Sequence, residues 1–551
     1  MAERRVKRIL WEASETDRVA ARALRALAKN KHDFSGDGPG GLKEADDRQG
    51  KADADYWAKK AAETNPKDWS DADVARFNET LVNQRDNPGF SERFATTLGA
   101  EGTLQFWRDM AAPPGGPVDG DRAKILAEVQ DNLSMTLATA TRSDSPAMDT
   151  WKREVIAAGG KTFGHEGMMT KAYGFQIMSN LMVKGNFDSG FLRDYGNAMR
   201  TFETDTKKPF DPASIWGNPG MAAQLDYSGK DGASGSDPMA GYLKAVSHNP
   251  SFATELFNQE DMADYLLSER EFYDEDDPFG KGDGTVQSRD ALGKALLAAG
   301  TGLNPDEPHV VTSNNHTDAQ REVLDGALSR LAARGDDFPP ELRDDMAGLL
   351  LNYGDETHHS ASALADDPGD PRLLDRHDLL EVSKQVSRSQ DAYGILNDGL
   401  NQEMLRDIHE DNPKDPKETL IRAGQTVGFL EEARYQALNT DKDAPTWDAK
   451  WGYHGLGGVV NFIPVVGDAA QRGVDALAYS WQLDEQGRID EEIQRQNGET
   501  FTSRENQLKA LAEEWGKANP GHTNSAYTLT DEINRAAFNG NDRANGLAGD
   551  Q

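Results

Sequence analysis

Residues 87–107, NPGFSERFATTLGAEGTLQFW, carry the pattern that decides the fold. The Asn-Pro pair at the start of this stretch is typical of a junction that ends one helix and opens the next. Phe90, Phe94 and Leu98 then recur at four-residue steps, which is the spacing of one apolar face of an α-helix. Similar spacing continues across residues 57–435, whereas strand-like alternation is scarce. The sequence therefore predicts an all-α protein.

The composition agrees with packed helices and narrows the choice of partners. Hydrophobic residues make up 37% and charged residues 28% of the 551 residues, a mix that supports packed amphipathic helices. The formal net charge of −34 argues against nucleic acid as a partner, because a polyanion repels phosphates. The chain has no cysteine, which excludes disulfide frameworks and thiolate zinc sites.

Short stretches that recur in the same order predict an internal duplication of the helical body. The Asn-Pro junction at Asn87 recurs at Asn249 and again at Asn412, each time after about 160 residues. Two further pairs of stretches resemble each other: LSMTLATAT from Leu133 with LGKALLAAGT from Leu292, and LMVKGNFDSGFLRD from Leu181 with LAARGDDFPPELRD from Leu331. The alternative is that Asn-Pro turns and amphipathic helices recur by chance. A duplicated helical body is more often a scaffold than a catalyst.

The predicted organisation has four parts. They are an N-terminal helical arm with a Gly/Asp loop at 1–60, a first copy of the helical body at 67–236, a second copy with the start of a partial third at 237–440, and a C-terminal apolar segment with a helix and a tail at 441–551. The polar stretch DYSGKDGASGSD at 226–237 is expected to link the two copies. The acidic stretch at 273–284 is expected to be a solvent-exposed loop.

The stretch GLGGVVNFIPVVG at 455–467 is a long uncharged run, mostly of glycines and apolar residues, so it must be buried in this protein, in a partner or in lipid. It is too short to span a bilayer as a helix, and its proline would break one. The residues expected to contact a partner or a membrane are Phe462, Ile463, Pro464, Val465, Val466, Val474, Leu477 and Trp481. A helix buried against the body, an element that inserts into membranes and a docking element for a partner helix all fit this pattern.

One stretch near the N-terminus is a weak candidate for a calcium site. Asp33, Ser35, Asp37 and Glu44 fall at the positions that supply oxygen ligands in an EF-hand loop. Against this interpretation, Gly40 occupies the eighth place, where the loop normally needs an apolar anchor. A flexible Gly/Asp turn after a helix explains the same residues. No metal or other cofactor is therefore predicted.

Other motifs of catalysis and ligand binding are incomplete. Residues 159–162, GGKT, match the end of a phosphate-binding loop, but Val155 stands where its leading glycine belongs, so a helix C-cap and turn is expected. His358 and His359 are adjacent, which on a helix would point their rings about 100° apart and away from shared metal binding. No HExxH motif and no GxSxG motif occurs. The sequence therefore predicts no catalytic residues, no small-molecule ligand and no enzyme activity.

Several segments resemble bacterial protein families. The string FIPVVGDA at 462–469 resembles the hydrophobic element often found just upstream of the toxin domain in polymorphic toxins. The segments at 87–107, 133–141 and 173–196 resemble an actinobacterial, streptomycete-type family of large helical proteins of unknown function, and the resemblance covers most of residues 67–518. Such proteins are similar to substrates and accessories of type VII-like secretion, in which a WXG-type helical hairpin leads the chain. Here no Trp-x-Gly turn joins two N-terminal helices.

A candidate export signal lies near the C-terminus. Tyr527 and Asp531 fit the Tyr-xxx-Asp signal associated with type VII-like secretion, and residues 265–269 and 273–277 fit its Tyr-xxx-Asp/Glu form as well. The paired arginines near the N-terminus lack a following apolar region, so no cleavable signal peptide is predicted. No transmembrane helix is predicted either. The chain is expected to be cytoplasmic or exported without a cleavable signal peptide.

Taken together, these features predict a non-enzymatic scaffold or delivery protein that the resemblance links to type VII-like secretion. Its expected partner is a protein, either a helical-hairpin protein or a separately encoded effector. One alternative is a membrane-active protein that inserts residues 455–481. A second alternative is a hydrolase of an unrecognised kind, in which buried carboxylates or histidines with shifted pKa values would converge in one place.

Overall fold

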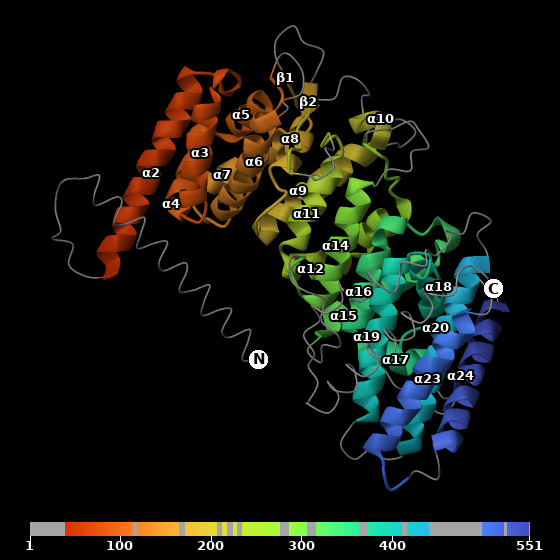
Figure 1. The fold of residues 1–551 in the computed structure, drawn as a ribbon. Helices are drawn as coiled ribbons and strands as arrows, with labels where there is room; N and C mark the ends of the chain where they lie inside the picture. The colour runs from red at the N-terminus through yellow and green to blue at the C-terminus, as the bar shows by residue number, and fades with distance from the viewer. Residues whose placement is uncertain are drawn as a thin grey trace. The chain divides into compact units, whose positions relative to one another are not determined.

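The structure is a computed structural model. It describes residues 39–113, 118, 120–164, 171–205, 212–217, 224–228, 234–275, 286–305, 316–362, 373–409, 416–439, 499–522 and 526–549. These residues confirm the all-α prediction, because helices supply nearly all of their regular structure and one sheet of two short strands supplies the rest (Figure 1). None of the described helices combines the length and the apolar composition that crossing a membrane requires.

The chain divides into two compact units. The first comprises Met1–Phe252 and Arg270–Ala295, and the second comprises Ala253–Glu269 and Leu296–Gln551. These divisions differ from the predicted boundary between two copies at 236–237. A division by compactness does not test a sequence duplication, so the duplication stays a prediction.

The first unit is built mainly of helices that follow one another along the chain. Its elements are α2 (Pro39–Glu63), the 3-10 turn η1 (Pro66–Asp68), α3 (Asp71–Gln84), α4 (Pro88–Leu98), α5 (Ala100–Ala111), α6 (Gly120–Thr141), α7 (Pro146–Ala157), β1 (Thr162–Gly164), β2 (Lys171–Tyr173), α8 (Gly174–Asn180), α9 (Ser189–Asp205), α10 (Pro212–Trp216), α11 (Pro238–Ser247) and the first parts of α12 (Pro250–Phe257) and α14 (Gln287–Thr301). The strands β1 and β2 pair antiparallel, with Phe163 opposite Ala172.

The predicted helix junction at Asn87 forms as expected. The Asn87 side-chain oxygen accepts hydrogen bonds from the backbone N–H groups of Gly89, at 2.9 Å, and Phe90, at 3.2 Å. Such a cap satisfies N–H groups that the first turn of a helix leaves free. Phe90 and Phe94 then stack at 5.8 Å and are fully buried, so the four-residue spacing does mark the buried face of α4.

The second Asn-Pro junction has the same local geometry. The Asn249 side-chain oxygen accepts from the Phe252 N–H at 3.2 Å, and its amide donates to the Phe187 carbonyl at 2.9 Å. Two glycines that the sequence match aligned, Gly185 and Gly335, both have a positive φ, of 90° and 50°. The third junction, at Asn412, lies outside the described residues. Local geometry thus agrees between the aligned segments at these points.

The second unit is a bundle in which the last helices of the chain run side by side (Figure 1). Its elements are the remainder of α12 and of α14, α13 (Glu260–Asp264), the π-helical turn η2 (Tyr265–Glu269), α15 (Asp318–Ala332), the 3-10 turns η3 (Gly335–Asp337) and η4 (Pro340–Leu342), α16 (Arg343–Asn352), α17 (Gly354–Ala361), α18 (Arg376–Val386), α19 (Gln390–Ile408), α20 (Pro416–Asn439), α23 (Glu499–Ala518) and α24 (Ala526–Gly549). One apolar cluster, which includes Leu405, Val427, Trp515 and Ile533, joins α19, α20, α23 and α24.

Glycines let α20 and α24 touch along their backbones. A Cβ on Gly428 would lie 1.9 Å from the Ala537 carbonyl oxygen, and a Cβ on Gly540 would lie 2.2 Å from the Gln425 carbonyl oxygen. Any larger residue at either position would therefore force the helices apart. Gly424 also faces Ala536. Because Gly424 precedes Gly428 on α20, and Ala536 precedes Ala537 on α24, the contacts advance in the same direction along both helices, which therefore run parallel.

Two polar stretches are more buried than the sequence predicts. The linker expected at 226–237 is held at its C-terminal end, where the Asn180 amide donates to the Gly235 carbonyl at 2.7 Å and the Gln176 amide donates to the Ser236 carbonyl at 2.7 Å. In the loop at 273–284, which was expected to be exposed, Tyr273 and Glu275 are each only 8% exposed. Side-chain amides of α8 and backbone N–H groups supply the hydrogen bonds that make this burial tolerable.

Candidate functional site

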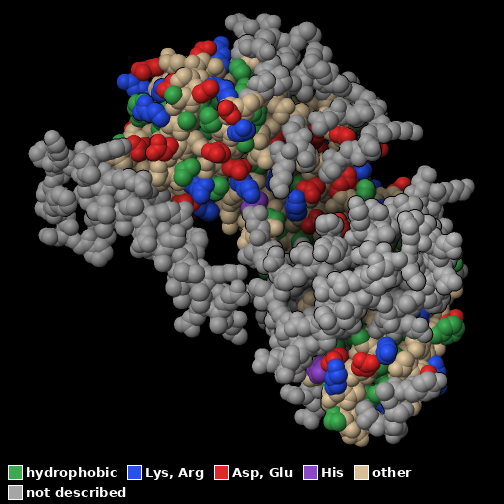
Figure 2. All heavy atoms as spheres, in the orientation of Figure 1, with side chains coloured by type: hydrophobic (Ala, Val, Ile, Leu, Met, Phe, Trp, Pro, Cys, Tyr) green, Lys and Arg blue, Asp and Glu red, His purple; other side chains and the backbone are tan. Residues whose placement is uncertain are grey.

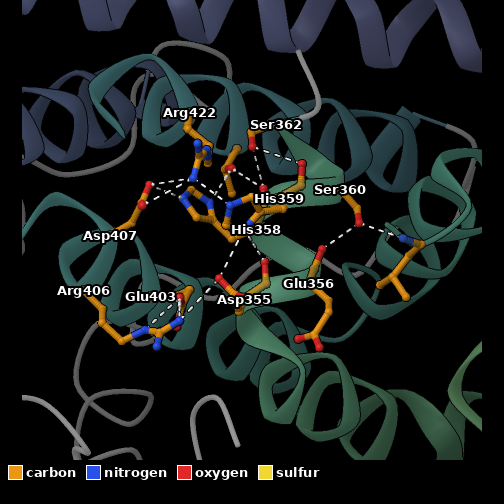
Figure 3. A network of polar contacts seen from close by, with 12 residues as sticks. Asp355, Glu356, His358, His359, Ser360, Ser362, Glu403, Arg406, Asp407 and Arg422 are labelled. Atoms are coloured by element: carbon orange, nitrogen blue, oxygen red, sulfur yellow. Dashed lines mark hydrogen bonds and ion pairs between the residues drawn. The ribbon is translucent and has the colours of Figure 1, made fainter. Parts of the chain in front are cut away.

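Polar side chains gather in the second unit where α17, α19 and α20 meet (Figure 3). α17 supplies two adjacent histidines and Asp355, and α19 and α20 supply the other charged groups around them. We call the set the His358–His359 network; it consists of Asp355, His358, His359, Glu403, Arg406, Asp407, Arg422 and Thr426. Because the two histidines are consecutive on a helix, their rings diverge, with an interplanar angle of 71° and 5.9 Å between centroids.

His358 is fully buried between an acid and a hydroxyl. Its Nε2 lies 3.5 Å from a carboxylate oxygen of Asp407, and its Nδ1 lies 2.7 Å from the Thr426 hydroxyl. This order of acid, imidazole and hydroxyl resembles the arrangement that activates a nucleophile. Thr426 is itself fully buried, so its hydroxyl has no exposed surface to offer a substrate. The hydroxyl instead pairs the buried Nδ1, while Nε2 has no hydrogen-bond partner and only the nearby Asp407 carboxylate.

The Thr426 hydroxyl can serve either protonation state of His358. It can donate to Nδ1 of the neutral ring, or it can accept from a protonated Nδ1 while donating to the His358 carbonyl at 3.3 Å. Burial disfavours the Asp407 carboxylate, but the His358 ring and the Arg422 guanidinium outweigh burial and hold the pKa of Asp407 below its usual value. Asp407 therefore stays charged and can pair with either partner.

His359 takes a different pair of partners. Its Nδ1 donates to the Asp355 carbonyl at 2.9 Å, and its Nε2 accepts from Arg422 at 2.7 Å. Because a guanidinium can only donate, Nε2 carries no proton in this arrangement. Burial disfavours a charged ring, yet hydrogen bonds to Asp355 outweigh burial and raise the pKa of His359. The same Arg422 nitrogen also donates to Asp407 at 3.3 Å, so protonation of His359 at Nε2 would set two donors against each other and leave Arg422 with Asp407.

The carboxylates and guanidinium groups of the His358–His359 network are unequal in number. Glu403 is 1% exposed and is paired with Arg406 through Nε at 2.9 Å, while Arg406 also lies 3.4 Å from an oxygen of Asp355. With Asp407 and Arg422, the network holds three carboxylates and two guanidinium groups. One histidine proton would balance them. The network can therefore bind a proton with little cost in buried charge.

The carboxylates and histidines of the described residues do not form a metal site. Among the residues that the structure describes, no set of three or more histidine, aspartate or glutamate side chains is arranged to hold a metal ion. The adjacent histidines at 358 and 359 accordingly take separate partners, as their helical spacing predicted.

The first unit contains a second buried cluster of charges. Arg270 donates to Glu203 at 2.9 and 3.1 Å and to Asp237 at 2.8 and 3.1 Å, and all three side chains are fully buried. We call these residues the Arg270 triad. Burial disfavours the charged guanidinium, but the two carboxylates outweigh it and raise the pKa of Arg270. Its charge is therefore permanent.

Glu275 lies close to this triad and behaves differently. One of its carboxyl oxygens accepts from the Ser236 N–H at 2.9 Å, while the other, Oε1, is buried and has no hydrogen-bond partner. Burial, followed by repulsion from Asp237, raises the pKa of Glu275 to about 8. At neutral pH the side chain is therefore a neutral acid, which is a form that tolerates burial.

The predicted site residues are spread over described and undescribed parts of the chain. Asp33, Ser35 and Asp37 of the weak calcium candidate lie outside the described residues. Glu44 is exposed on α2, which begins at Pro39, so the second half of the candidate loop is helical. The eight expected contact residues of the apolar segment, from Phe462 to Trp481, also lie outside the described residues.

Two other predicted features can be located. Tyr527 and Asp531 both lie on α24, one helical turn apart, and Asp531 is partly exposed. The GGKT stretch at 159–162 follows α7 and leads into β1, which confirms the predicted turn. A phosphate-binding loop runs in the opposite order, from a strand into a helix.

Neither buried cluster was predicted from the sequence. Arg422 meets His359 across 63 residues, and Arg270 meets Glu203 across 67. The available signal was the run of polar residues 354–360 between two apolar helices, because a polar helix that is buried must find partners.

Comparison of the chain with known protein families, with curated proteins and with solved structures found no match.

Proposed function

We propose that the protein is a non-enzymatic helical scaffold that acts through protein partners. The observation that carries this proposal is the closure of its buried polar clusters. A catalytic nucleophile or acid must touch its substrate, whereas His358 and Thr426 have no exposed surface and are bonded within the network. The side chains of the Arg270 triad are likewise fully buried and saturated by one another.

The rest of the described structure suits a scaffold. Backbone contact between α20 and α24 makes a stiff helix pair, and helical bodies commonly present extended surfaces to partners. Acidic and basic side chains are interspersed over the described surface in view in Figure 2. Such a surface favours specific protein contacts over attachment to a polyanion.

We assign the partner contacts to the arm at 1–60 and to residues 455–481. The partner is a helical-hairpin protein or a separately encoded effector. Tyr527 and Asp531 are proposed to direct export by a type VII-like route. This assignment rests on the sequence patterns and on the position of the Tyr527 and Asp531 pair at the start of α24.

Affinity capture from the producing organism tests these assignments. Full-length tagged protein would be purified from cell lysate and from culture medium, next to a tag-only control. We expect one partner to copurify with the wild type and to be lost with Val465→Asp/Val466→Asp. We expect recovery from the medium to be lost with Tyr527→Ala/Asp531→Ala, while Tyr435→Lys, an exposed change on α20, alters neither. Absence of any partner above the tag-only control would contradict the scaffold.

Two further assays separate the alternative functions, a membrane-active protein and a hydrolase, from the scaffold. Leakage of lipid vesicles by the wild type that Val465→Asp/Val466→Asp abolishes would favour a membrane-active protein. Hydrolysis of an ester, amide or glycoside substrate that Thr426→Val abolishes would favour an enzyme and would contradict the closure of the His358–His359 network.

A further inference from the structure

The outward face of α24 exposes one large apolar side chain between charged residues. Its inner face is buried against neighbouring helices through Leu529, Ile533, Ala537 and Ala544. On the opposite face Phe538 is 66% exposed. A phenyl ring on an outward helical face costs free energy in water, which an association partner would remove.

Charged residues flank Phe538 in a regular order. Asp531, Arg535, Phe538 and Asp542 are spaced by four, three and four residues, so they form one stripe along the helix. Arg535 and Asp542 are both exposed. They lie two turns apart, which is about 10 Å, so they cannot pair with each other on one helix. Within the described part of the chain no ion pair links Arg535 to Asp531 or to Asp542.

We propose that this stripe, Arg535–Phe538–Asp542, is a self-association surface whose occupant is α24 of a second copy of the chain. When two copies of a helix are placed antiparallel about a two-fold axis near Phe538, Arg535 of each copy faces Asp542 of the other. The same operation brings the two Phe538 rings together. The stripe is therefore complementary to itself in both charge and apolar surface, which is the requirement for an isologous dimer.

The order of charges also selects the direction of pairing. A parallel pair would place Arg535 against Arg535 and Asp542 against Asp542, and like charges in contact oppose association. The helix has 24 residues, about 36 Å in length, which is enough for several turns of contact. A single helix on each side makes a small interface, so the dimer is reversible, with a Kd on the order of micromolar.

Sedimentation velocity of the full-length protein between roughly 1 and 100 μM tests the proposal. We expect the mass to rise from 60.3 kDa toward twice that value as concentration increases. Phe538→Lys is expected to weaken association at least tenfold. Tyr435→Lys is the matched control, because Tyr435 is 64% exposed on α20 and lies outside the stripe.

Charge reversal distinguishes this antiparallel pairing from non-specific association. Arg535→Asp and Asp542→Arg are each expected to abolish self-association, because each places like charges opposite one another twice. An equimolar mixture of the two single variants is expected to form a heterodimer, since every contact then joins opposite charges. The double variant Arg535→Asp/Asp542→Arg is expected to associate like the wild type.

Three outcomes would overturn the proposal. The first is a wild type that stays monomeric at all concentrations, and the second is a dimer that both single charge reversals leave intact. The third is a mixture of the two single variants that stays monomeric. Helix content by circular dichroism is expected to be unchanged in every variant because the altered side chains are exposed, so loss of association can be separated from loss of folding.

Discussion

The Arg270 triad of the first unit and the His358–His359 network of the second both contain more carboxylates than permanent cations. The triad holds two carboxylates around one guanidinium, and all of its side chains are fully buried. The network holds three carboxylates, two guanidinium groups and two imidazoles. Each cluster thus lacks one positive charge, and the two compensate for it differently.

The difference lies in which group can take up a proton. Arginine does not change its charge in the accessible pH range, so the triad is fixed. Beside it, Glu275 avoids adding a further negative charge by staying protonated. In the network a histidine can supply the missing charge. The charge of a cluster built on buried arginine therefore does not change with pH, whereas the charge of a cluster that contains buried histidine does.

Removal of the guanidinium should break the triad with the largest effect. Arg270→Met leaves Glu203 and Asp237 buried without a cation, so we expect a loss of about 3–5 kcal/mol in the free energy of unfolding. Urea unfolding at pH 7 measures it. The triple variant Arg270→Met/Glu203→Gln/Asp237→Asn is expected to recover part of the loss, because no buried charge remains. A loss below about 1 kcal/mol for Arg270→Met would show that the triad is not sealed from water.

Glu275 offers the next largest effect. Its pKa of about 8 in the folded protein exceeds that of an unfolded glutamate, about 4.3, so its stabilising contribution is complete below pH 4.3 and is lost as the pH rises toward 8. Glu275→Gln mimics the neutral acid, because it keeps the shape of the side chain without a group that can ionise. We expect the variant to match the wild type at pH 4.5 and to exceed it by on the order of 2–4 kcal/mol at pH 8.5.

The exposed neighbour Glu271 provides the control for this prediction. Glu271→Gln changes the same charge without burial and is expected to shift stability by less than about 0.5 kcal/mol at either pH. Equal stabilities of Glu275→Gln and the wild type at pH 8.5 would mean that the pKa of Glu275 is not raised in the folded protein.

The comparison also shows how far sequence patterns reach. Phe90 and Phe94 were predicted to share a buried helical face, and the Asn87 cap was predicted beside them, because both relations span four residues or fewer. Glu275 was placed in an exposed acidic loop, since composition predicts exposure. Its burial depends on the Ser236 N–H, which lies 39 residues earlier in the chain.

The Arg270 triad and the His358–His359 network could not be predicted from sequence patterns either, because their partners are also far apart in the chain. The sequence predicted from helical geometry that His358 and His359 point away from shared metal binding, and they do take separate partners. Asp355 lies on the same helix, but the other partners come from α19 and α20, and which side chains those helices present depends on how the unit packs. Local periodicity identifies the face of a helix, but it does not identify what lies across from that face.

In the network, the Thr426 hydroxyl should matter less than the arginine of the triad. Thr426→Val keeps the shape of the side chain and leaves Nδ1 of the buried His358 without its partner at 2.7 Å. We expect a loss of about 1–3 kcal/mol, measured by thermal and urea unfolding. Thr204→Val, an exposed change on α9, is the control and should stay within about 0.5 kcal/mol. Equal stability of Thr426→Val and the wild type would show that His358 does not need this hydrogen bond.

The smallest effect, and the sharpest test of the comparison, is the pH response of His359. Its folded pKa is raised above the unfolded value of about 6.5, so its contribution is complete below pH 6.5 and is lost as the pH rises through the folded pKa. Because Glu275 loses stability over an overlapping range, the measurement belongs in the Glu275→Gln background. There, stability should fall by up to about 1 kcal/mol between pH 6 and 8, and His359→Gln should flatten that fall. An unchanged slope would mean that the pKa of His359 is the same in the folded and unfolded protein, and the network would then be as indifferent to pH as the triad.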